Sequence, residues 1–342
     1  MVEIKKLVRP NIASLQAYSS ARDEFKGKEG IFLDANENPF GNLNRYPDPQ
    51  QKKLKKKLAE LKGIESDIIF VGNGSDEVID LAFRLFCNPG IDKALTFTPA
   101  YGMYAVSAAI NNVELLEIPL NEVFQIELES VKFFLSDKHL KLIFICSPNN
   151  PTGNLIDKKS IEFILKKFNG IVIVDEAYID FSEGESLINL IAQYNNLIVS
   201  QTLSKAWGLA AARIGLAYAD IEIISFYNKV KPPYNVSELN QKAAIQTLKD
   251  RSFFEQNRMT ILREKERLEF ELNQLELVKK LYPSDANFLL IELENADEIY
   301  TALVNQRIIT RNRNKQVANC IRISIGTEEE NTKLLNALKN IR

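Results

Sequence analysis

The sequence predicts an α/β fold, with a large domain built on a mainly parallel sheet covered by helices and a second, smaller α+β domain. Between residues 68 and 200, short apolar stretches alternate with helical patterns, which is the order expected of parallel strands joined by crossover helices. After Pro232-Pro233 the chain changes to a long, charged helical stretch followed by two more strands. Its 342 residues suit about two domains. We therefore expect the domain junction near the paired prolines.

The elements of the large domain follow from the spacing of apolar residues. Residues 52–62 repeat leucine at helical spacing with lysines between, so the basic residues are the solvated side of an amphipathic helix. The elements expected next are strand 68–71, helix 76–86, strand 93–97, helix 101–109, strand 140–146, helix 158–168, strand 170–174 and strand 197–200. This alternation indicates a mainly parallel sheet with helices on both faces.

The smaller domain is expected to contain a helical stretch over about 238–275 and strands at 288–292 and 321–325. We assign residues 45–234 to the large domain. Residues 1–44 and 235–342 are assigned to the small domain, with the first of these segments forming an N-terminal arm.

The composition of the chain gives no support to several classes of function. The 43 basic and 45 acidic residues nearly cancel, which gives no reason to expect a nucleic-acid or membrane partner. The three cysteines are far apart and odd in number, so a disulfide framework is not expected and a reducing compartment is favoured. No segment has the pattern of a signal peptide or a membrane span. We expect a soluble, cytoplasmic protein without a metal site, and His139 alone offers no catalytic dyad.

Lys205 is the strongest candidate for chemistry. It lies among small and apolar residues in 202–215, where loss of solvation favours the neutral amine that can attack an aldehyde. An isolated lysine is more often solvated, but Ser204 and Arg213 place a hydroxyl and a guanidinium nearby that can bind an anion. Asp175 ends the apolar run 171–174, so its carboxylate should reach the crevice where α/β sheets bind ligands. Pyridoxal phosphate needs an amine, a carboxylate and an anion site of this kind.

Further polar segments should meet at the same edge of the sheet. Residues 72–77 follow a strand and open a helix, a context that binds phosphate, although glycine-rich turns are often only turns. Residues 147–153 follow another apolar strand, and a tight turn is the alternative interpretation. Asn150 and Tyr178 are candidates to hold the 3-oxygen of the cofactor. Tyr101 is either a ring that stacks on the cofactor or an ordinary core tyrosine.

In this order, the motifs resemble the fold-type I pyridoxal-phosphate-dependent aminotransferases, and most closely the family of histidinol-phosphate aminotransferases. The resemblance spans nearly the whole chain and rests on residues 18–22, 33–39, 45–49, 72–77, 101–104, 147–153, 175–178, 202–215, 231–236 and 321–327. It implies the large and small domains of the pyridoxal-phosphate-dependent transferase fold.

The resemblance also implies a role for each matching residue. Lys205 would be the Schiff-base lysine and proton shuttle, Asp175 the partner of the pyridine nitrogen, and Tyr178 a catalytic partner of the 3-oxygen together with Asn150. The remaining cofactor-binding residues would be Gly74, Ser75, Asp76, Tyr101, Thr202, Ser204 and Arg213, with Tyr46 reaching across a homodimer to the cofactor phosphate of the other chain.

Substrate binding is implied for Arg322 and Arg311, which would hold the acidic end of the substrate, and for Tyr18 and Asn36. Arg313 is an additional candidate for the role of Arg311. The stretch from Arg311 to Arg322 is about two residues shorter than the family pattern suggests, and Gln201 stands where that pattern leads us to expect arginine.

The expected reaction is transamination of histidinol phosphate to imidazole acetol phosphate, in the biosynthesis of histidine. By the same resemblance, 2-oxoglutarate then takes the amino group and leaves as glutamate, with ping-pong kinetics. Two other enzymes of this fold are alternatives: a threonine-phosphate decarboxylase and an aromatic amino-acid aminotransferase. A cofactor-sensing regulator is a less favoured alternative, because no segment of the chain is expected to form an added DNA-binding domain.

Overall fold

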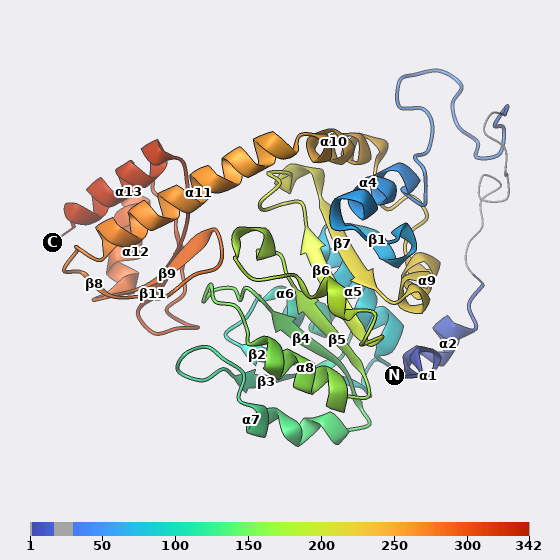
Figure 1. Ribbon diagram of the computed structural model, residues 1–342, viewed down its shortest axis with the longest axis horizontal. Helices are drawn as coiled ribbons and strands as arrows, with labels where there is room; N and C mark the ends of the chain where they lie inside the picture. The colour runs from blue at the N-terminus through green and yellow to red at the C-terminus, as the bar shows by residue number, and fades with distance from the viewer. Residues whose placement is uncertain (1, 17–29, 342) are drawn as a thin grey trace.

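The computed structural model describes residues 2–16 and 30–341, and two β-sheets organise them (Figure 1). The large sheet has the strand order β1-β7-β6-β5-β4-β2-β3. Its strands are β1 (Ile69–Asn73), β2 (Lys93–Thr98), β3 (Glu114–Pro119), β4 (Leu140–Cys146), β5 (Ile171–Asp175), β6 (Leu197–Thr202) and β7 (Ile214–Ala219). Strands β2 to β6 pair in parallel, and β7 runs antiparallel to both of its neighbours. The predicted mainly parallel sheet is confirmed.

Helices cover both faces of the large sheet. They are α1 (Ile4–Leu7), α2 (Pro10–Ala13), α4 (Lys52–Lys62), α5 (Ser75–Phe86), α6 (Met103–Ile110), α7 (Leu128–Lys132), α8 (Lys158–Lys167) and α9 (Ile221–Val230). Strand β5 shows how the two cores arise. Val172 and Val174 enter the hydrophobic cluster on one face, while Ile171 and Ile173 enter the cluster on the other. Alternate side chains of a strand point to opposite faces, so a strand buried on both faces is apolar throughout.

The small sheet is antiparallel, with strand order β10-β11-β9-β8. Its strands are β8 (Val278–Leu281), β9 (Phe288–Leu293), β10 (Arg311–Asn312) and β11 (Cys320–Ser324), and its helices are α11 (Arg251–Leu272), α12 (Ala296–Asn305) and α13 (Glu328–Lys339). Ile321 and Ile323 of β11 pack into the core formed with these helices. By the same alternation, Arg322 lies on the opposite face of the sheet.

The single helical stretch predicted over 238–275 is wrong in one respect, because it is divided. Helix α10 (Glu238–Lys249) ends before Asp250, and α11 begins directly after it. The carboxylate of Asp250 accepts a hydrogen bond from the backbone N–H of Phe253 at 3.0 Å, which caps the start of α11. The cap therefore allows a new helix to begin directly after Asp250.

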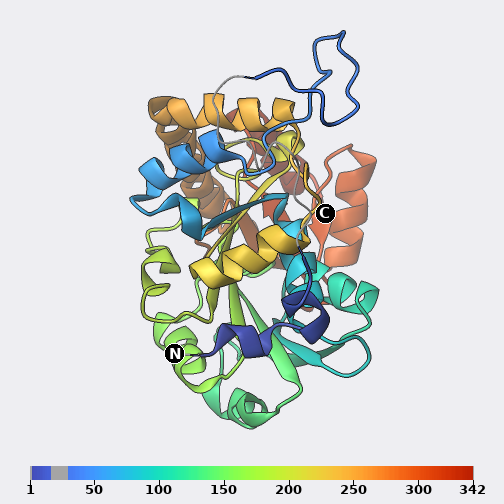
Figure 2. The ribbon, with the colours of Figure 1, turned by 90° about the vertical axis from the view of Figure 1, so that its right-hand side faces the viewer.

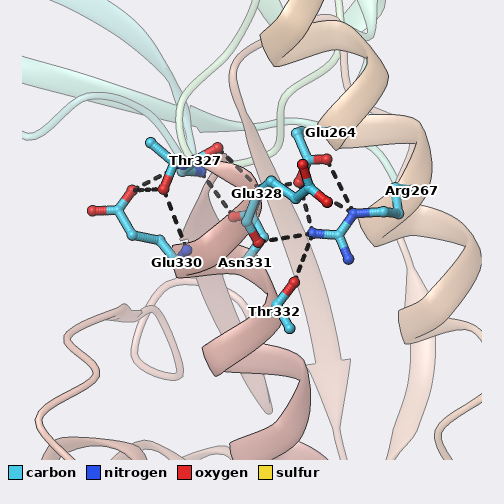
Figure 3. A network of polar contacts seen from close by, with 8 residues as sticks. Glu264, Arg267, Thr327, Glu328, Glu330, Asn331 and Thr332 are labelled. Carbon is cyan, nitrogen blue, oxygen red and sulfur yellow. Dashed lines mark hydrogen bonds and ion pairs between the residues drawn. The ribbon is translucent and has the colours of Figure 1, made fainter.

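A polar network fixes α11 to the turn that follows β11 (Figure 3). The carboxylate of Glu264 accepts hydrogen bonds from Arg267 at 2.8 Å and from the side-chain amide of Asn331 at 2.8 Å. Asn331 also accepts from the backbone N–H of Gly326 at 2.9 Å. The network thus ties the segment after Arg322 to the long helix.

We propose that the two sheets mark two domains, with boundaries that follow the packing. Ile4 and Val8 belong to a hydrophobic cluster of the large sheet. Ala244 and Leu248 of α10 belong to the other large-sheet cluster. The division predicted at residue 235 would separate α10 from that cluster. We therefore propose that the small domain begins within α11, and that residues 2–16 belong with the large domain.

Within the described residues, the helices are too short or too polar to cross a membrane.

Candidate active site

The carboxyl ends of β4, β5 and β6 converge on one cavity. Its lining comes from these three strand ends and the loops after them, from the start of α5 and from the loop between β2 and α6: Ser75, Asp76, Tyr101, Cys146, Asn150, Asp175, Ala177, Tyr178, Thr202, Ser204, Lys205 and Arg213. Ten of these twelve side chains are among the predicted site residues, the exceptions being Cys146 and Ala177. Parallel strands bring their carboxyl ends to the same edge, which explains why segments distant in sequence meet here.

Asp175 provides a buried carboxylate at the end of β5. Its side chain accepts hydrogen bonds from the Tyr104 hydroxyl at 2.9 Å and from the Ala177 backbone N–H at 3.2 Å. Burial raises the pKa of Asp175 to about 6, while the two hydrogen bonds oppose that rise. The group is therefore ionised near neutral pH and retains acceptor capacity for a cationic ring nitrogen.

Lys205 lies in the loop between β6 and β7. Its Nζ is 5.7 Å from the centre of the Tyr178 ring. Although the residue is exposed to the solvent of the cavity, the surrounding protein lowers its pKa, and the charges of Arg322 and Arg213 lower it further. The neutral amine is therefore more abundant than in a fully solvated lysine.

One corner of the cavity offers donors for an anion. Ser75 begins α5, whose first-turn N–H groups have no acceptor within the helix. The Oγ atoms of Thr202 and Ser204 are 2.9 Å apart. Arg213 forms an ion pair with Asp76 at 3.4 Å, with both side chains partly exposed. This corner thus combines hydroxyl, guanidinium and helix N-terminal groups.

Two glycines make the close approach of strand and helix possible. Gly74 has φ +82°, and a Cβ there would lie 2.4 Å from Arg213 Nη2. A Cβ on Gly215 would lie 2.1 Å from the carbonyl carbon of Gly74. Larger residues would therefore displace Arg213 or separate β7 from the start of α5.

A hydrogen-bonded chain links this cavity to the small sheet. The side-chain amide of Asn150 donates to the Tyr178 hydroxyl at 3.2 Å, and the guanidinium of Arg322 donates to the Asn150 carbonyl. Arg322 also lies against the Phe288 ring, with its Cζ 5.1 Å from the ring centre. Its Nε is buried and has no hydrogen-bond partner. Arg322 therefore retains a donor for an anionic ligand.

The Tyr101 ring lies beside the cavity as predicted, and its hydroxyl donates to Asp76 at 3.2 Å. Its ring meets that of Tyr104 edge-on, with centres 5.8 Å apart. Tyr104 was missed by the sequence reasoning. Tyr104 lies in the first turn of α6, whereas Tyr101 precedes that helix, so no helical spacing in the sequence indicates that the two rings meet.

Several predicted residues do not line the cavity within one chain. Tyr46 stacks on Tyr234, with ring centres 4.4 Å apart, and together with Asn36 it lines a separate cavity of about 530 Å³. Arg311 is exposed and pairs with Arg322 across the β10–β11 ladder. Tyr18 lies outside the described residues.

The donor set suits pyridoxal phosphate. The anion corner matches a phosphate, and the buried carboxylate of Asp175 matches a protonated ring nitrogen. Asn150 and Tyr178 are hydrogen-bonded to each other and could hold a ring oxygen together, and the Lys205 amine lies over the Tyr178 ring in the same cavity. The residues present therefore fit the cofactor that the sequence motifs implied.

Comparison with known proteins places similar sequences in a family of aminotransferases. The family of class I and II aminotransferases matches residues 25–338. A histidinol-phosphate aminotransferase from Parabacteroides distasonis is 51% identical over 345 residues and is covered over its full length, as is this chain.

Solved structures of similar fold include the histidinol-phosphate aminotransferase from Clostridium acetobutylicum, with a TM-score of 0.80 and 29% identity over 87% of this chain and 90% of that one. The histidinol-phosphate aminotransferase from Sinorhizobium meliloti, solved in complex with pyridoxal 5'-phosphate, has a TM-score of 0.78 and 22% identity over 89% and 88% of the two chains. At that identity the likeness concerns the fold.

Proposed function

The chain belongs to the class I and II aminotransferase family, and on that basis we propose that it is a histidinol-phosphate aminotransferase of histidine biosynthesis. It transfers the amino group of L-histidinol phosphate to 2-oxoglutarate, which yields imidazole acetol phosphate and L-glutamate. The observation that carries this assignment is full-length identity of about half to relatives with that name. Its cofactor is pyridoxal 5'-phosphate.

When bound, pyridoxal phosphate supplies an aldehyde for the amino group and a pyridine ring that withdraws electrons from the reacting carbon. In our proposal Ser75, Thr202, Ser204 and Arg213 hold its phosphate, with the backbone of Gly74 and the side chain of Asp76 beside them. Asp175 keeps the ring nitrogen protonated. Tyr101 lies against the ring, and Asn150 and Tyr178 hold the ring oxygen.

Lys205 carries the covalent and acid–base chemistry in this proposal. Its lowered pKa supports the neutral amine that a Schiff-base lysine would need in order to hold the cofactor through its aldehyde. When substrate takes its place, the freed amine can accept the proton from the substrate carbon and return it on the cofactor side.

Arg322 holds the acidic end of each substrate, with Arg311 beside it. The support for this role is a half-buried guanidinium whose buried Nε has no hydrogen-bond partner and whose Nη1 donates to Asn150 of the cofactor cavity. A guanidinium binds phosphate and carboxylate in similar forked geometry, so one residue can serve histidinol phosphate and glutamate in turn.

We further propose a homodimer in which Tyr46 reaches the cofactor phosphate of the other chain and Asn36 contacts its substrate. The blue segment before α4 stands out from the body of the protein in both views (Figures 1 and 2). It exposes large apolar side chains: Ile31 is 90% exposed, Leu33 89% and Phe40 82%. Exposed apolar residues concentrated on one segment favour burial against another chain, and a second copy would satisfy them and complete both sites.

A cytoplasmic location is also part of the proposal. Cys87, Cys146 and Cys320 are all buried and unpaired, which suits a reducing compartment.

A substrate panel tests the assignment. Holoenzyme is supplied with 2-oxoglutarate and one of L-histidinol phosphate, L-threonine phosphate or an aromatic amino acid, while glutamate and CO₂ are measured. We expect glutamate with the highest kcat/KM for histidinol phosphate and no CO₂. Release of CO₂ from threonine phosphate would favour the decarboxylase alternative, and a higher kcat/KM for an aromatic amino acid would favour the other.

A further inference from the structure

Arg313 extends a row of arginines on the face of the small sheet that carries Arg322. Arg311 and Arg322 are directly opposite each other in the β10–β11 ladder. The backbone N–H of Arg313 donates to the Cys320 carbonyl at 2.9 Å, so the same register continues by two residues. Residues two apart on a strand share a face, and Arg313 therefore lies on the face of Arg311 and Arg322.

The surroundings of Arg313 lead toward the active site. Burial and, to a smaller extent, the charges of Arg322 and Arg311 together lower the pKa of Arg313 to about 10, while the Tyr178 hydroxyl opposes this shift. Tyr178 comes from the large sheet and lines the cofactor cavity. The ladder therefore places Arg313 close to Arg322, the arginine assigned to the substrate, which itself contacts Asn150 of the cofactor cavity.

Positive charge is concentrated here without a compensating acid. Among residues 2–16 and 30–341, no carboxylate forms an ion pair with Arg311, Arg313 or Arg322. Like charges directly opposite on neighbouring strands are unfavourable. An anionic ligand would remove that cost. Three clustered arginines therefore suit a ligand that carries more than one negative charge.

The Arg313 side chain is fixed by one hydrogen bond and keeps a donor that has no partner. Its Nη1 donates to the side-chain oxygen of Gln316 at 3.0 Å, while its Nε is buried without a partner. Gln316 therefore fixes one arm of the guanidinium. The Nε of Arg322 is likewise buried and has no hydrogen-bond partner.

We propose that Arg313 is a specificity-determining residue that contacts the phosphate of the substrate and makes the pocket favour a phosphate over a carboxylate. A phosphate ester carries up to two negative charges and three terminal oxygens, whereas the distal carboxylate of 2-oxoglutarate carries one charge and two oxygens. Coulomb attraction scales with charge, so an added guanidinium gains more from phosphate. This inference rests on the proposed function, because it takes histidinol phosphate as the amino donor.

The test compares the two half-reactions of the holoenzyme. For Arg313→Gln we expect kcat/KM for L-histidinol phosphate to fall roughly 10- to 100-fold, the range for loss of a charge-assisted hydrogen bond. For 2-oxoglutarate the expected fall is about threefold or less. Unphosphorylated L-histidinol should react equally with wild type and variant, and Arg313→Lys should retain part of the preference for phosphate.

Lys315→Gln is the matched control, since it removes an exposed positive charge from the same loop. It should leave the ratio of the two kcat/KM values unchanged. Equal losses for both substrates in Arg313→Gln, or no loss for histidinol phosphate, would overturn the inference. If wild type itself fails to react with histidinol phosphate, it is the proposed function that fails, and the two outcomes are therefore distinct.

Discussion

Arg322 of the small sheet donates a hydrogen bond to Asn150, which lies in the loop after β4 of the large sheet. The two residues are separated by 172 positions in the chain. Asn150 passes the connection on to Tyr178, beside the Lys205 amine. Arg322, assigned to the substrate, is therefore coupled to the residues assigned to the cofactor. Substitution of Arg322 should alter the properties of those residues.

Removing the Arg322 charge should raise the pKa of Lys205. Burial and the Arg322 charge both lower that pKa, so Arg322→Gln removes the second cause and leaves a smaller neutral fraction at a given pH. We expect the pH midpoint for capture of added pyridoxal phosphate by the cofactor-free protein to move upward. The capture rate, followed by absorbance between pH 6 and 10, measures this. An unchanged midpoint in Arg322→Gln would show that the coupling is absent, and Lys315→Gln is again the control.

Replacement of Lys205 by alanine should separate binding from chemistry. The proposed phosphate and ring contacts come from other residues, so Lys205→Ala should still bind pyridoxal phosphate. Turnover should fall by roughly 10³-fold or more, because both the nucleophile and the proton carrier are lost. Equilibrium dialysis and steady-state glutamate formation measure the two effects. Turnover near that of wild type would contradict the role of Lys205.

The ionised carboxylate of Asp175 should lower the stability of the cofactor-free protein, although the reaction needs it. The pKa of Asp175 in the folded protein is about 6, above its ordinary value of 3.8. Between pH 3.8 and pH 6, the folded protein therefore keeps a proton on Asp175 that the unfolded chain has lost. Ionisation therefore lowers the stability of the cofactor-free protein as pH rises through this window, by up to about 3 kcal/mol at 1.36 kcal/mol per pKa unit.

Asp175→Asn removes this cost, and the cofactor-free variant should have a higher Tm than wild type at pH 7.5 and a similar Tm near pH 4. Its turnover should nevertheless collapse, because the ring nitrogen loses its anionic partner. Thermal melts at the two pH values measure the difference. A lower Tm for the variant at pH 7.5 would contradict the assigned cause.

Glu264 shows the opposite dependence on pH. Hydrogen bonds from Arg267 and Asn331 lower its pKa, so its stabilising contribution is present above the ordinary value of 4.5 and is lost as pH falls through the lowered one. Glu264→Gln should reduce the free energy of unfolding by about 1–3 kcal/mol at pH 7 and by less in acid. Urea unfolding measures this, with Glu266→Gln, an exposed neighbour on α11, as the control. Equal effects of the two substitutions would argue against the network.

The shared site of the proposed homodimer predicts complementation. In a mixture of Tyr46→Ala and Lys205→Ala chains, a mixed dimer has one site with both residues intact. Random pairing makes half of the dimers mixed, so activity should recover to about a quarter of wild type. Activity that stays at the average of the two single variants after subunits are exchanged would show that Tyr46 acts within its own chain or not at all.

The sequence predicted the central strands and the cofactor residues because both carry local signals. β4, β5 and β6 are continuous apolar runs with polar residues at their carboxyl ends, and that pattern indicates both a buried strand and a site. β3 and β7 were not predicted. β3, at the sheet edge, has the sequence ELLEIP, which neither forms a continuous apolar run nor alternates regularly. β7 continues a stretch of small residues that is also typical of a loop.

Other features depend on contacts between distant segments. Nothing near Tyr104 in the chain indicates that its hydroxyl meets Asp175. The contact between Arg322 and Asn150 requires the small sheet to face the large one. The break at Asp250 has a local signal, because aspartate is a favoured N-cap residue, but the charged helical pattern on both sides obscured it.

The most direct test of the central claim is the absorbance spectrum of the holoenzyme before and after L-histidinol phosphate, with no oxo acid present. Transfer of the amino group predicts loss of the band of the lysine-bound cofactor and appearance of the pyridoxamine phosphate spectrum, reversed by 2-oxoglutarate. Persistence of the lysine-bound band at saturating histidinol phosphate would contradict the assignment of that substrate. Absence of any such band in Lys205-containing protein with added pyridoxal phosphate would contradict the cofactor site itself.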